Sequence, residues 1–314
     1  MSRIELPHLT RRQIVQTGLL ASAGAVLPHS LMAAQGTLPM IAKAIPSSGE
    51  KLPVIGVGTN QFGRTEYSAV RDVLKRMHEL GGTVIDTAAG YGESEVQIGK
   101  ALTELGITDR MFIVTKFNGA DGGYGGPLYS KESVDRSFQR LKKIDLLFIH
   151  FASSVDSQMP LLADLKKQGK VKYIGITSTR SSEYPQIAQF MRKYPMDIVQ
   201  IKYSLEDRAV EKEILPLALE KKIGIQVAQP FDGARNSLIT KAGSRALPPW
   251  AADYDITSWG QFFLKYVVSH PAVIGAIPGS TKVSHVEDNQ AAGRGRLPDA
   301  AGRKKMEEFW ATVS

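Results

Sequence analysis

Short apolar runs that look like strands recur along this chain, at a spacing that leaves room for a helix between most neighbours. The runs begin near Val54, Thr83, Met111, Asp145, Val171, Met196, Gly224 and Val273. Several segments between them repeat apolar residues at helical spacing, as in a helix with one buried face. These stripes are Val70, Val73, Leu74 and Met77, then Val134, Phe138 and Leu141, and then Ile187, Phe190, Met191 and Tyr194. About eight alternating units predict an α/β fold of the (β/α)8 or TIM-barrel type.

The main competing architecture is a doubly wound open sheet that binds a dinucleotide after its first strand. Such a sheet usually carries the fingerprint GxGxxG at that place. The first strand here reads VIGVGTNQFG from Val54, and no third glycine stands at the right position. The sequence therefore favours the closed barrel over the open sheet.

Ionisable residues stand at the ends of three of the apolar runs. Asp86 ends one run, Lys116 ends IVTK and His150 ends LLFIH. Tyr91 follows Asp86 by five residues, in a glycine-flanked turn. Taken singly, each has an ordinary reading as a turn former, a solvated edge charge, a core histidine or a packed loop aromatic. In a barrel, however, the carboxyl ends of the strands share one face and supply the catalytic groups, so the four together predict an active site.

Motifs spread over most of the chain resemble those of the aldo-keto reductase family, from about Lys51 to the end. They are GVGT at Gly56, DTAAGYG at Asp86, VTK at Val114, FIH at Phe148, VQIKYS at Val199 and IPGSTKVSHVEDN at Ile277. The resemblance implies a nicotinamide-dependent reductase of a small carbonyl substrate, an aldehyde or a ketone, and it requires no metal. The catalytic tetrad of the family maps to Asp86, Tyr91, Lys116 and His150.

These four residue types suit the reduction of a carbonyl, which needs a hydride at carbon and a proton at oxygen. Tyrosine has a pKa of about 10 and is a reluctant donor near neutral pH. The ammonium of Lys116 beside Tyr91 would lower that pKa by roughly 1 to 3, and Asp86 would keep the lysine charged in a dry pocket. His150 would bind the substrate oxygen and stabilise the negative charge that develops there.

The segment after the last strand carries the features of a phosphate site. It passes through a Pro-Gly pair into an expected helix start, where backbone N–H groups and the helix dipole favour an anion. Ser280 and Lys282 add a hydroxyl and a positive charge, although a plain helix start with a solvated lysine is the alternative reading. The resemblance places the adenosine 2′-phosphate here and the adenine near Asp288 and Asn289, and so implies NADP (NADPH) rather than NAD. Family members often carry an arginine where His285 stands.

The resemblance assigns the nicotinamide end of the cofactor to residues at the ends of other strands. They are Thr59, Thr177, Ser178, Gln200 and Pro230. Many relatives place a tyrosine or tryptophan shortly before that proline, whereas this chain has Ala228 and Gln229 there. Ring support for the nicotinamide is then lost, or it comes from Tyr203 or Phe231. The tetrad favours an active reductase, and the missing aromatic favours the alternative, a cofactor-binding regulatory or sensor protein with little turnover.

The first forty or so residues do not fit the barrel pattern. Residues 10–28 read TRRQIVQTGLLASAGAVLP, in which Arg11 and Arg12 precede a weakly apolar stretch and small residues. This order predicts a twin-arginine signal, read by the export machinery and leading to the periplasm. The apolar stretch is too short for a stable membrane span, and the alternative is a disordered arm on a cytoplasmic protein. We expect residues 1–40 to form the leader and residues 41–314 to form a single barrel domain.

The formal net charge is +8, and the excess is spread along the chain without a long basic run. Nucleic-acid binding is therefore unsupported, and an anionic cofactor is a sufficient partner for the charge. We expect a monomer whose substrate specificity resides in the loops above the barrel, namely residues 117–129, the segment after His150 and residues 232–257. Trp250 is expected to anchor the second of these loops, and a terminal helix is expected to end near Trp310.

Overall fold

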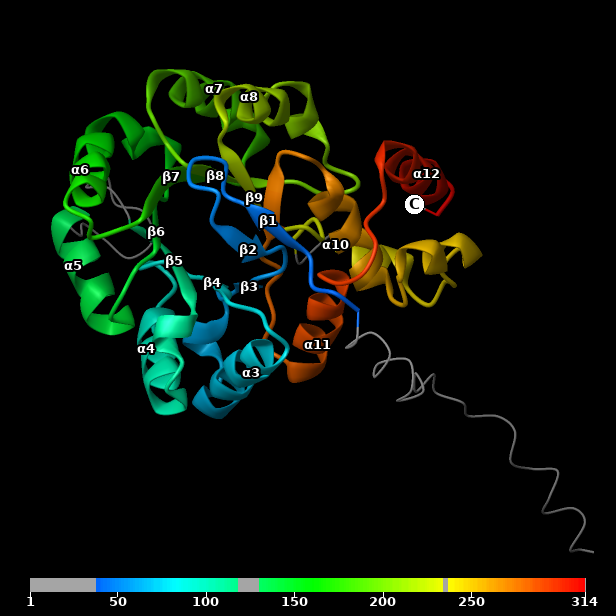
Figure 1. The fold of residues 1–314 in the computed structure, drawn as a ribbon, viewed down its shortest axis with the longest axis horizontal. Coiled ribbons are helices and arrows are strands. Elements are labelled where there is room, and N and C mark those ends of the chain that lie inside the picture. The colour runs from blue at the N-terminus through cyan, green and yellow to red at the C-terminus, as the bar shows by residue number, and fades with distance from the viewer. Residues whose placement is uncertain (1–37, 118–129, 234–236, 314) are drawn as a thin grey trace, which may run out of the picture. The chain divides into compact units, whose positions relative to one another are not determined.

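Eight parallel strands curl around a common axis at the centre of the protein (Figure 1). The computed structural model describes residues 38–117, 130–233 and 237–313. The strands of this sheet are β3 (Val57–Gly58), β4 (Val84–Asp86), β5 (Phe112–Phe117), β6 (Leu146–Ile149), β7 (Tyr173–Ser178), β8 (Ile198–Lys202), β9 (Gly224–Ala228) and β10 (Val273–Ala276). Each strand pairs in parallel with its neighbour in the sequence.

The two outer strands of the sheet, β3 and β10, are joined to each other. Isolated parallel bridges connect Ile55 with Ala276 and Gly58 with Gly279. The amide of Gly56 also donates to the carbonyl oxygen of Ala276 at 2.9 Å. The sheet therefore closes into a (β/α)8 barrel, which confirms the predicted architecture and excludes the doubly wound open sheet.

Helices surround the barrel and cover the outer faces of its strands (Figure 1). They are α3 (Tyr67–Glu79), α4 (Ser94–Leu105), α5 (Ser130–Leu141), α6 (Val155–Lys167), α7 (Tyr184–Lys193), α8 (Ile214–Lys221), α10 (Trp259–Ser269) and α11 (Val283–Ala292). All four residues of the stripe predicted on α3 are buried. In the other two stripes, Phe138 and Tyr194 are only partly buried against the core.

Shorter helices and a terminal helix complete the described elements. They are α9 (Leu238–Ala242), α12 (Ala300–Trp310) and the 3-10 helices η1 (Phe62–Arg64), η2 (Thr108–Arg110), η3 (Ala152–Ser154), η4 (Ser181–Glu183), η5 (Ala209–Lys212) and η6 (Pro249–Tyr254). The terminal helix ends at Trp310, as expected from the sequence. None of the helices in the described ranges combines the length and the apolar character that a membrane crossing needs.

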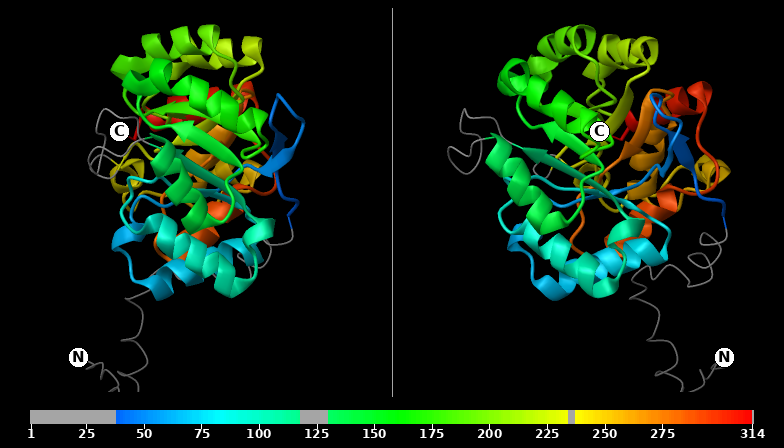
Figure 2. Two further views of the ribbon diagram at one scale, coloured as in Figure 1. Left: turned by 90° about the vertical axis from the view of Figure 1, so that its left-hand side faces the viewer. Right: turned by 60° about the vertical axis from the view of Figure 1, so that its left-hand side comes forward.

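A short antiparallel hairpin, β1 (Ala42–Ala44) and β2 (Lys51–Pro53), covers the amino ends of the barrel strands. Leu52 packs inside the barrel on the first residues of several strands, including Val84 and Phe112. The Nζ atom of Lys43 donates to three carbonyl oxygens between the end of α10 and the start of β10, at 2.7, 2.9 and 2.9 Å. Figure 2 shows this hairpin at one end of the barrel and the α9 segment toward the other end. The barrel thus has a closed floor, and the carboxyl ends of the strands form the opposite face.

Two aspartates hold the floor of the barrel in the same way. Asp145 precedes β6 and accepts the amide of Ile113 at 2.9 Å, while Asp197 precedes β8 and accepts the amide of Ile174 at 2.9 Å. Each carboxylate therefore satisfies a buried N–H at the start of the preceding strand, where an unpaired donor would be costly. Both residues serve the fold rather than the chemistry.

Candidate active site

Four side chains that the sequence singled out meet at the carboxyl ends of adjacent strands. Asp86 is the last residue of β4, Lys116 lies in β5, and His150 follows β6 directly. The Nζ atom of Lys116 lies 2.5 Å from Asp86 Oδ1 and 2.8 Å from the carbonyl oxygen of Thr87. The same Nζ atom lies 5.4 Å from the centre of the Tyr91 ring. The Tyr91 and His150 rings lie 5.9 Å apart, edge to face at 79°, so all four predicted catalytic residues share one place.

The charged pair at the centre of this group is almost completely removed from water. The Lys116 and Asp86 side chains are 1% and 2% exposed. Burial raises the pKa of Asp86 above its ordinary value, while the charge of Lys116 and hydrogen bonds from Lys116 and Gln200 act in the opposite direction. These contacts favour the carboxylate form, which can hold the lysine ammonium beside Tyr91.

The imidazole of His150 is neutral over the whole physiological range. Burial, and secondarily the positive charge of Lys116, lowers the pKa of His150 to about 3. Its ring stacks on Phe151 with the ring centres 4.8 Å apart. A neutral imidazole carries one N–H donor, which suits a hydrogen bond to a substrate oxygen.

Gln200, predicted to bind the carboxamide of the nicotinamide, is bound within the protein. Its Nε2 atom donates to Asp86 Oδ2 and to Gln226 Oε1, both at 2.7 Å. Its Oε1 atom accepts from the hydroxyl of Thr177 at 3.1 Å. The structure therefore brings two predicted cofactor residues, Thr177 and Gln200, next to the tetrad. Gln226 was not among the predicted site residues, although the two-residue period of β9 indicates a polar side chain that faces inward.

Two other predicted cofactor residues are engaged in local contacts. The hydroxyl of Ser178 donates to Glu183 Oε2 at 2.6 Å and accepts the amide of Arg180 at 3.1 Å. The hydroxyl of Thr59 donates to the carbonyl oxygen of Asp86 at 2.9 Å and accepts from Ser94 at 3.0 Å. Both side chains shape the loops around the site through these bonds.

The aromatic residues proposed to replace the missing ring have different positions. Tyr203 is fully buried, and its hydroxyl donates to Glu211 and accepts from Arg303 at 2.5 Å. These bonds hold its hydroxyl between η5 and α12, which makes Tyr203 wrong as a candidate for ring support. Phe231 packs partly buried against the core, and Gln229 is exposed in the left-handed region at φ 51°.

The end of β9 carries the small residue Ala228 and a buried proline. Ala228 is the last residue of β9 and is 7% exposed, and Pro230 is buried two residues later.

Trp250 packs against Phe262 and Phe309 at ring distances of 5.9 Å each. This packing agrees with the expected role of Trp250 as an anchor of its loop.

The segment between β10 and α11 offers a place for an anionic group. Ser280 is 5% exposed, and its Oγ atom has no hydrogen-bond partner among the described residues. Lys282 is the exposed N-cap of α11, so its side chain and the first amides of that helix lie at the same end. A Cβ on Gly58 would lie 2.7 Å from the carbonyl oxygen of Ile277, so only glycine permits the close approach of these strands. A buried orphan hydroxyl two residues before a lysine that caps a helix fits a phosphate.

The residues expected near the adenine are partly occupied by protein contacts. Asp288 accepts from the Ser258 hydroxyl and from Gln261 Nε2, both at 2.8 Å. Burial raises the pKa of this carboxyl. Asn289 is 7% exposed on the same helix. Asp288 therefore stabilises the start of α10 through these two hydrogen bonds.

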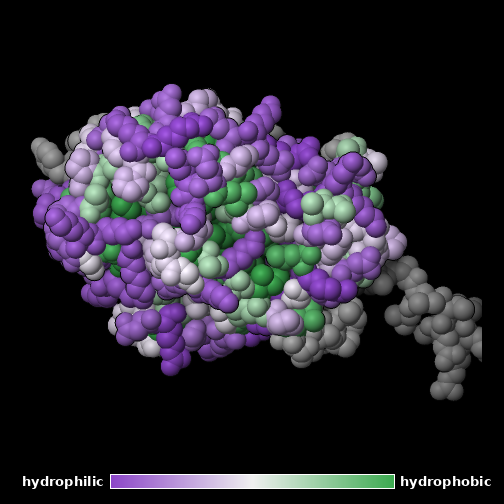
Figure 3. All heavy atoms as spheres, turned by 45° about the horizontal axis from the view of Figure 1, so that its top comes forward, coloured by the Kyte–Doolittle hydropathy of each residue, from purple (hydrophilic) through white to green (hydrophobic). Residues whose placement is uncertain are grey.

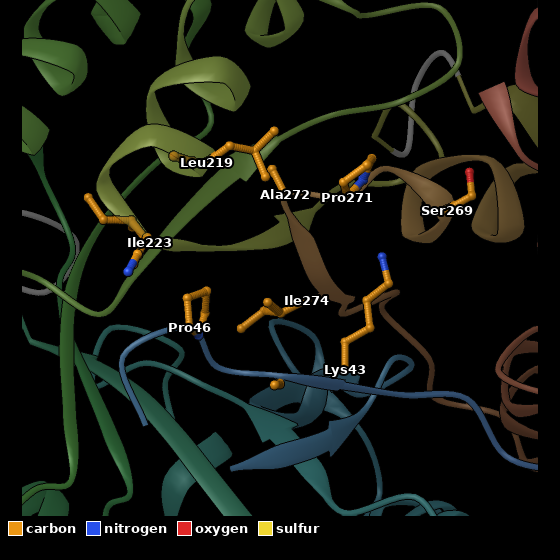
Figure 4. A pocket seen from close by; sticks show the side chains of 11 residues that line it. Lys43, Pro46, Leu219, Ile223, Ser269, Pro271, Ala272 and Ile274 are labelled. Carbon is orange, nitrogen blue, oxygen red and sulfur yellow. The ribbon is translucent and has the colours of Figure 1, made fainter. Parts of the chain in front are cut away.

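A cavity lies among the described residues at the opposite end of the barrel from the tetrad. It has a volume of about 540 Å³ and is lined by Lys43 and Pro46 of the hairpin region, by Leu219 and Ile223 near α8, and by Ile274 of β10 (Figure 4). The ammonium of Lys43 is already bound by three carbonyl oxygens. Hydrophilic residues cover most of the face shown in Figure 3, with hydrophobic residues in its hollowed centre. Apart from Lys43, Lys222 and Ser269, the lining of this floor cavity is apolar, so the cavity lacks a cluster of reactive groups.

Parts of the predicted substrate loops lie outside the described residues. These are positions 118–129 and 234–236. In the described ranges, no group of three or more His, Cys, Asp or Glu residues could hold a metal ion.

Comparisons with known proteins agree with this geometry. A family model described as Aldo/keto reductase family matches residues 54–304. The chain is 28% identical to the NADH-specific methylglyoxal reductase of Escherichia coli, over 78% of this chain and 89% of that protein. It is 29% identical to the methylglyoxal reductase YeaE of the same organism, over 79% of this chain and 88% of that protein.

Solved structures show the same fold. The holo form of an aldo-keto reductase from Bacillus halodurans has a TM-score of 0.70 at 22% identity, covering 86% of this chain and 96% of that chain. An aldo-keto reductase from Klebsiella pneumoniae in complex with NADPH has a TM-score of 0.66 at 20% identity, with the same coverage of 86% and 96%.

Proposed function

This chain belongs to the aldo/keto reductase family, and from that membership we propose that it reduces an aldehyde or ketone to an alcohol with NADPH, using Tyr91 as the general acid. The observation that carries the proposal is the buried ion pair of Lys116 and Asp86, whose lysine lies 5.4 Å from the Tyr91 ring. A buried ion pair of this kind is expensive to maintain. The phenol of Tyr91 beside it is partly exposed, so the ion pair can influence the proton that Tyr91 donates.

The side chains divide the proton chemistry among them. The phenol of Tyr91 delivers a proton to the carbonyl oxygen, and the Lys116 ammonium stabilises the phenolate that remains. Asp86 supplies the counter-charge, and its bond to Lys116 fixes where the ammonium lies. The neutral His150 donates a hydrogen bond to the substrate oxygen without competing for the proton. Bound NADPH would supply the hydride.

The cofactor proposal rests on the segment around Ser280 and Lys282. The orphan hydroxyl, the lysine and the start of α11 together suit the extra phosphate that distinguishes NADPH from NADH. A structural neighbour is described in complex with NADPH, whereas one relative is described as NADH-specific. We therefore propose a preference for NADPH that depends on Lys282.

Two relatives suggest where to look for the substrate. Both are described as methylglyoxal reductases and cover most of this chain. We propose that small reactive aldehydes, with methylglyoxal first, are substrates.

One observation favours a second function, a cofactor-binding regulatory or sensor protein with little turnover. Ala228 offers no ring to the nicotinamide, and Tyr203 is bound elsewhere by Glu211 and Arg303. If the nicotinamide ring were held loosely, the cofactor would bind but hydride transfer from it would be inefficient.

The decisive experiment follows NADPH absorbance with a panel of aldehydes and ketones in the parent and in Tyr91→Phe. Removal of a general acid lowers kcat by roughly 10²- to 10⁴-fold, and NADPH affinity should stay unchanged. Tyr67→Phe is the matched control, because Tyr67 lies on α3 and its hydroxyl donates to Glu104. Binding of NADPH without turnover of any carbonyl would refute the reductase and support the sensor. Equal rates for Tyr91→Phe and the parent would refute the role of Tyr91.

For the cellular location we propose export to the periplasm by the twin-arginine route. Residues 1–37 lie outside the described part of the structure, so the support is the Arg11–Arg12 pair and the apolar stretch that follows it. This route carries folded proteins, so the cofactor could enter the protein before export.

A further inference from the structure

The inside of the barrel contains a row of polar side chains beneath the tetrad. Thr177, Gln200 and Gln226 are register neighbours on the adjacent strands β7, β8 and β9. All three are nearly buried, at 3%, 2% and 5% exposed. Register partners on neighbouring parallel strands point to the same side of the sheet, so the three side chains form one continuous row inside the barrel.

Hydrogen bonds connect this row to Asp86 across the barrel. The Thr177 hydroxyl donates to Gln200 Oε1 at 3.1 Å, and Gln200 Nε2 donates to Gln226 Oε1 and to Asp86 Oδ2 at 2.7 Å each. The carboxylate determines the direction of the chain, because an ionised carboxylate only accepts hydrogen bonds. Gln200 must therefore turn its NH2 group toward Asp86, and its second N–H then needs an acceptor.

Gln226 supplies that acceptor. In the reversed orientation, the Gln200 oxygen would face two other oxygens, those of Asp86 and Gln226. Without Gln226, one N–H of Gln200 would lose its partner in a nearly dry interior, and the amide could rotate away from the carboxylate. We propose that Gln226 is a positioning residue of the reaction, because its side-chain oxygen holds the Gln200 amide and, through it, the Asp86 carboxylate that keeps Lys116 beside Tyr91. This inference rests on the proposed function of the tetrad.

The groups around Asp86 give the inference a pH signature. Among the described residues, Lys116 from β5 contacts Asp86 directly, Tyr91 from the turn after β4 lies against Lys116, and His150 from the end of β6 lies against Tyr91. Strands β8 and β9 contribute only amides. The hydrogen bond from Gln200 lowers the pKa of Asp86 against the effect of burial. Loosening Gln200 should therefore make the carboxylate accept a proton at higher pH.

The test measures the titration of the Asp86 carboxyl directly, by carbon NMR of aspartate-labelled protein, with Asp86→Asn for assignment. Complete loss of a hydrogen bond to a charged group corresponds to roughly 1 to 2 pH units. We expect that upward shift for Gln200→Leu and about half of it for Gln226→Leu. The acid limb of kcat/KM should move by the same amount. Gln97→Leu is the control, because it removes a half-buried amide on α4 that donates to Thr65.

A double variant shows whether Gln226 acts through Gln200. Gln200→Leu with Gln226→Leu should shift the Asp86 titration no further than Gln200→Leu alone. An unchanged titration in Gln226→Leu would make this residue a packing residue and overturn the proposal. An additional shift in the double variant would overturn the proposed order of action. If Gln226→Leu does not fold, Gln226→Met preserves the side-chain length without the oxygen and is judged by the same outcomes. The NMR titration reads Asp86 even if no carbonyl is reduced, so failure of the proposed reductase activity is seen separately.

Discussion

The neutral imidazole of His150 should make the protein progressively less stable as the pH falls below about 6.5. The ordinary pKa of histidine is 6.5, and burial together with the charge of Lys116 lowers the pKa of His150 to about 3. Between these two values the unfolded chain binds a proton that the folded protein excludes. The free energy of unfolding therefore rises with pH over this interval, and the contribution is fully present only above the pKa of the unfolded state.

The size of the effect follows from the interval between the two pKa values. At about pH 5 the unfolded chain lies about 1.5 pH units below the ordinary pKa of 6.5, while the folded imidazole is still neutral. At about 1.4 kcal/mol for each pH unit, His150 lowers the free energy of unfolding by about 2 kcal/mol relative to about pH 8. The variant His150→Gln keeps an N–H donor but cannot be protonated, so it should lose this pH dependence.

The assay is urea unfolding of the parent and of His150→Gln at both pH values. Any packing defect in the variant acts at both pH values and cancels when the two differences are compared. We expect the parent to lose about 2 kcal/mol more than the variant between about pH 8 and about pH 5. Equal losses in the two proteins would show that the folded protein does not lower the pKa of His150, and would refute the claim that the fold keeps this imidazole neutral.

Three further predictions test the cofactor site and the export signal. Lys282→Glu should weaken NADPH binding by roughly tenfold or more, about 1.4 kcal/mol, and NADH binding much less; equal losses measured by fluorescence titration would remove the 2′-phosphate from this segment, and Lys304→Glu on α12 is the control. Ala228→Tyr should tighten NADPH binding by roughly 2- to 10-fold, because an aromatic contact contributes about 0.5 to 1.5 kcal/mol; an unchanged dissociation constant in the folded variant would show that the missing ring is unimportant. Changing Arg11 and Arg12 to lysine should retain the protein in the cytoplasm, and unchanged fractionation of cells would contradict twin-arginine export.

The sequence predicts the barrel because its strands and helices follow local periods. Seven observed strands begin within two residues of the predicted position, and the exception is β3, which begins at Val57 rather than near Val54. The stretch around Val54 still joins β10 through the bridge at Ile55. The β1–β2 hairpin was missed because each of its strands has three residues, which is too short to show an alternating pattern.

Contacts between residues far apart in the chain cannot be read from local sequence patterns. The Tyr203 hydroxyl binds Arg303, which lies 100 residues later in the chain. This contact holds the tyrosine away from the position in which its ring would support the nicotinamide. The strand period shows that Gln200 and Gln226 face inward, but it does not show that their amides bind each other or Asp86. Such partners depend on how strands curl around the barrel and on side-chain rotamers, and neither is encoded in a local pattern.

The direction of the strands explains how one barrel interior can hold both a stable core and a charged pair. On β4 the inward side chain changes from Val84 to Asp86, and on β5 it changes from Val114 to Lys116. The apolar residues at the amino ends pack with Leu52 of the hairpin and contribute stability by burial. The ion pair contributes little to stability, because desolvation offsets its attraction, yet removing one partner would leave an unpaired buried charge and cost about 3 to 5 kcal/mol. The site can therefore keep its expensive pair only because the apolar level beneath it stabilises the barrel independently.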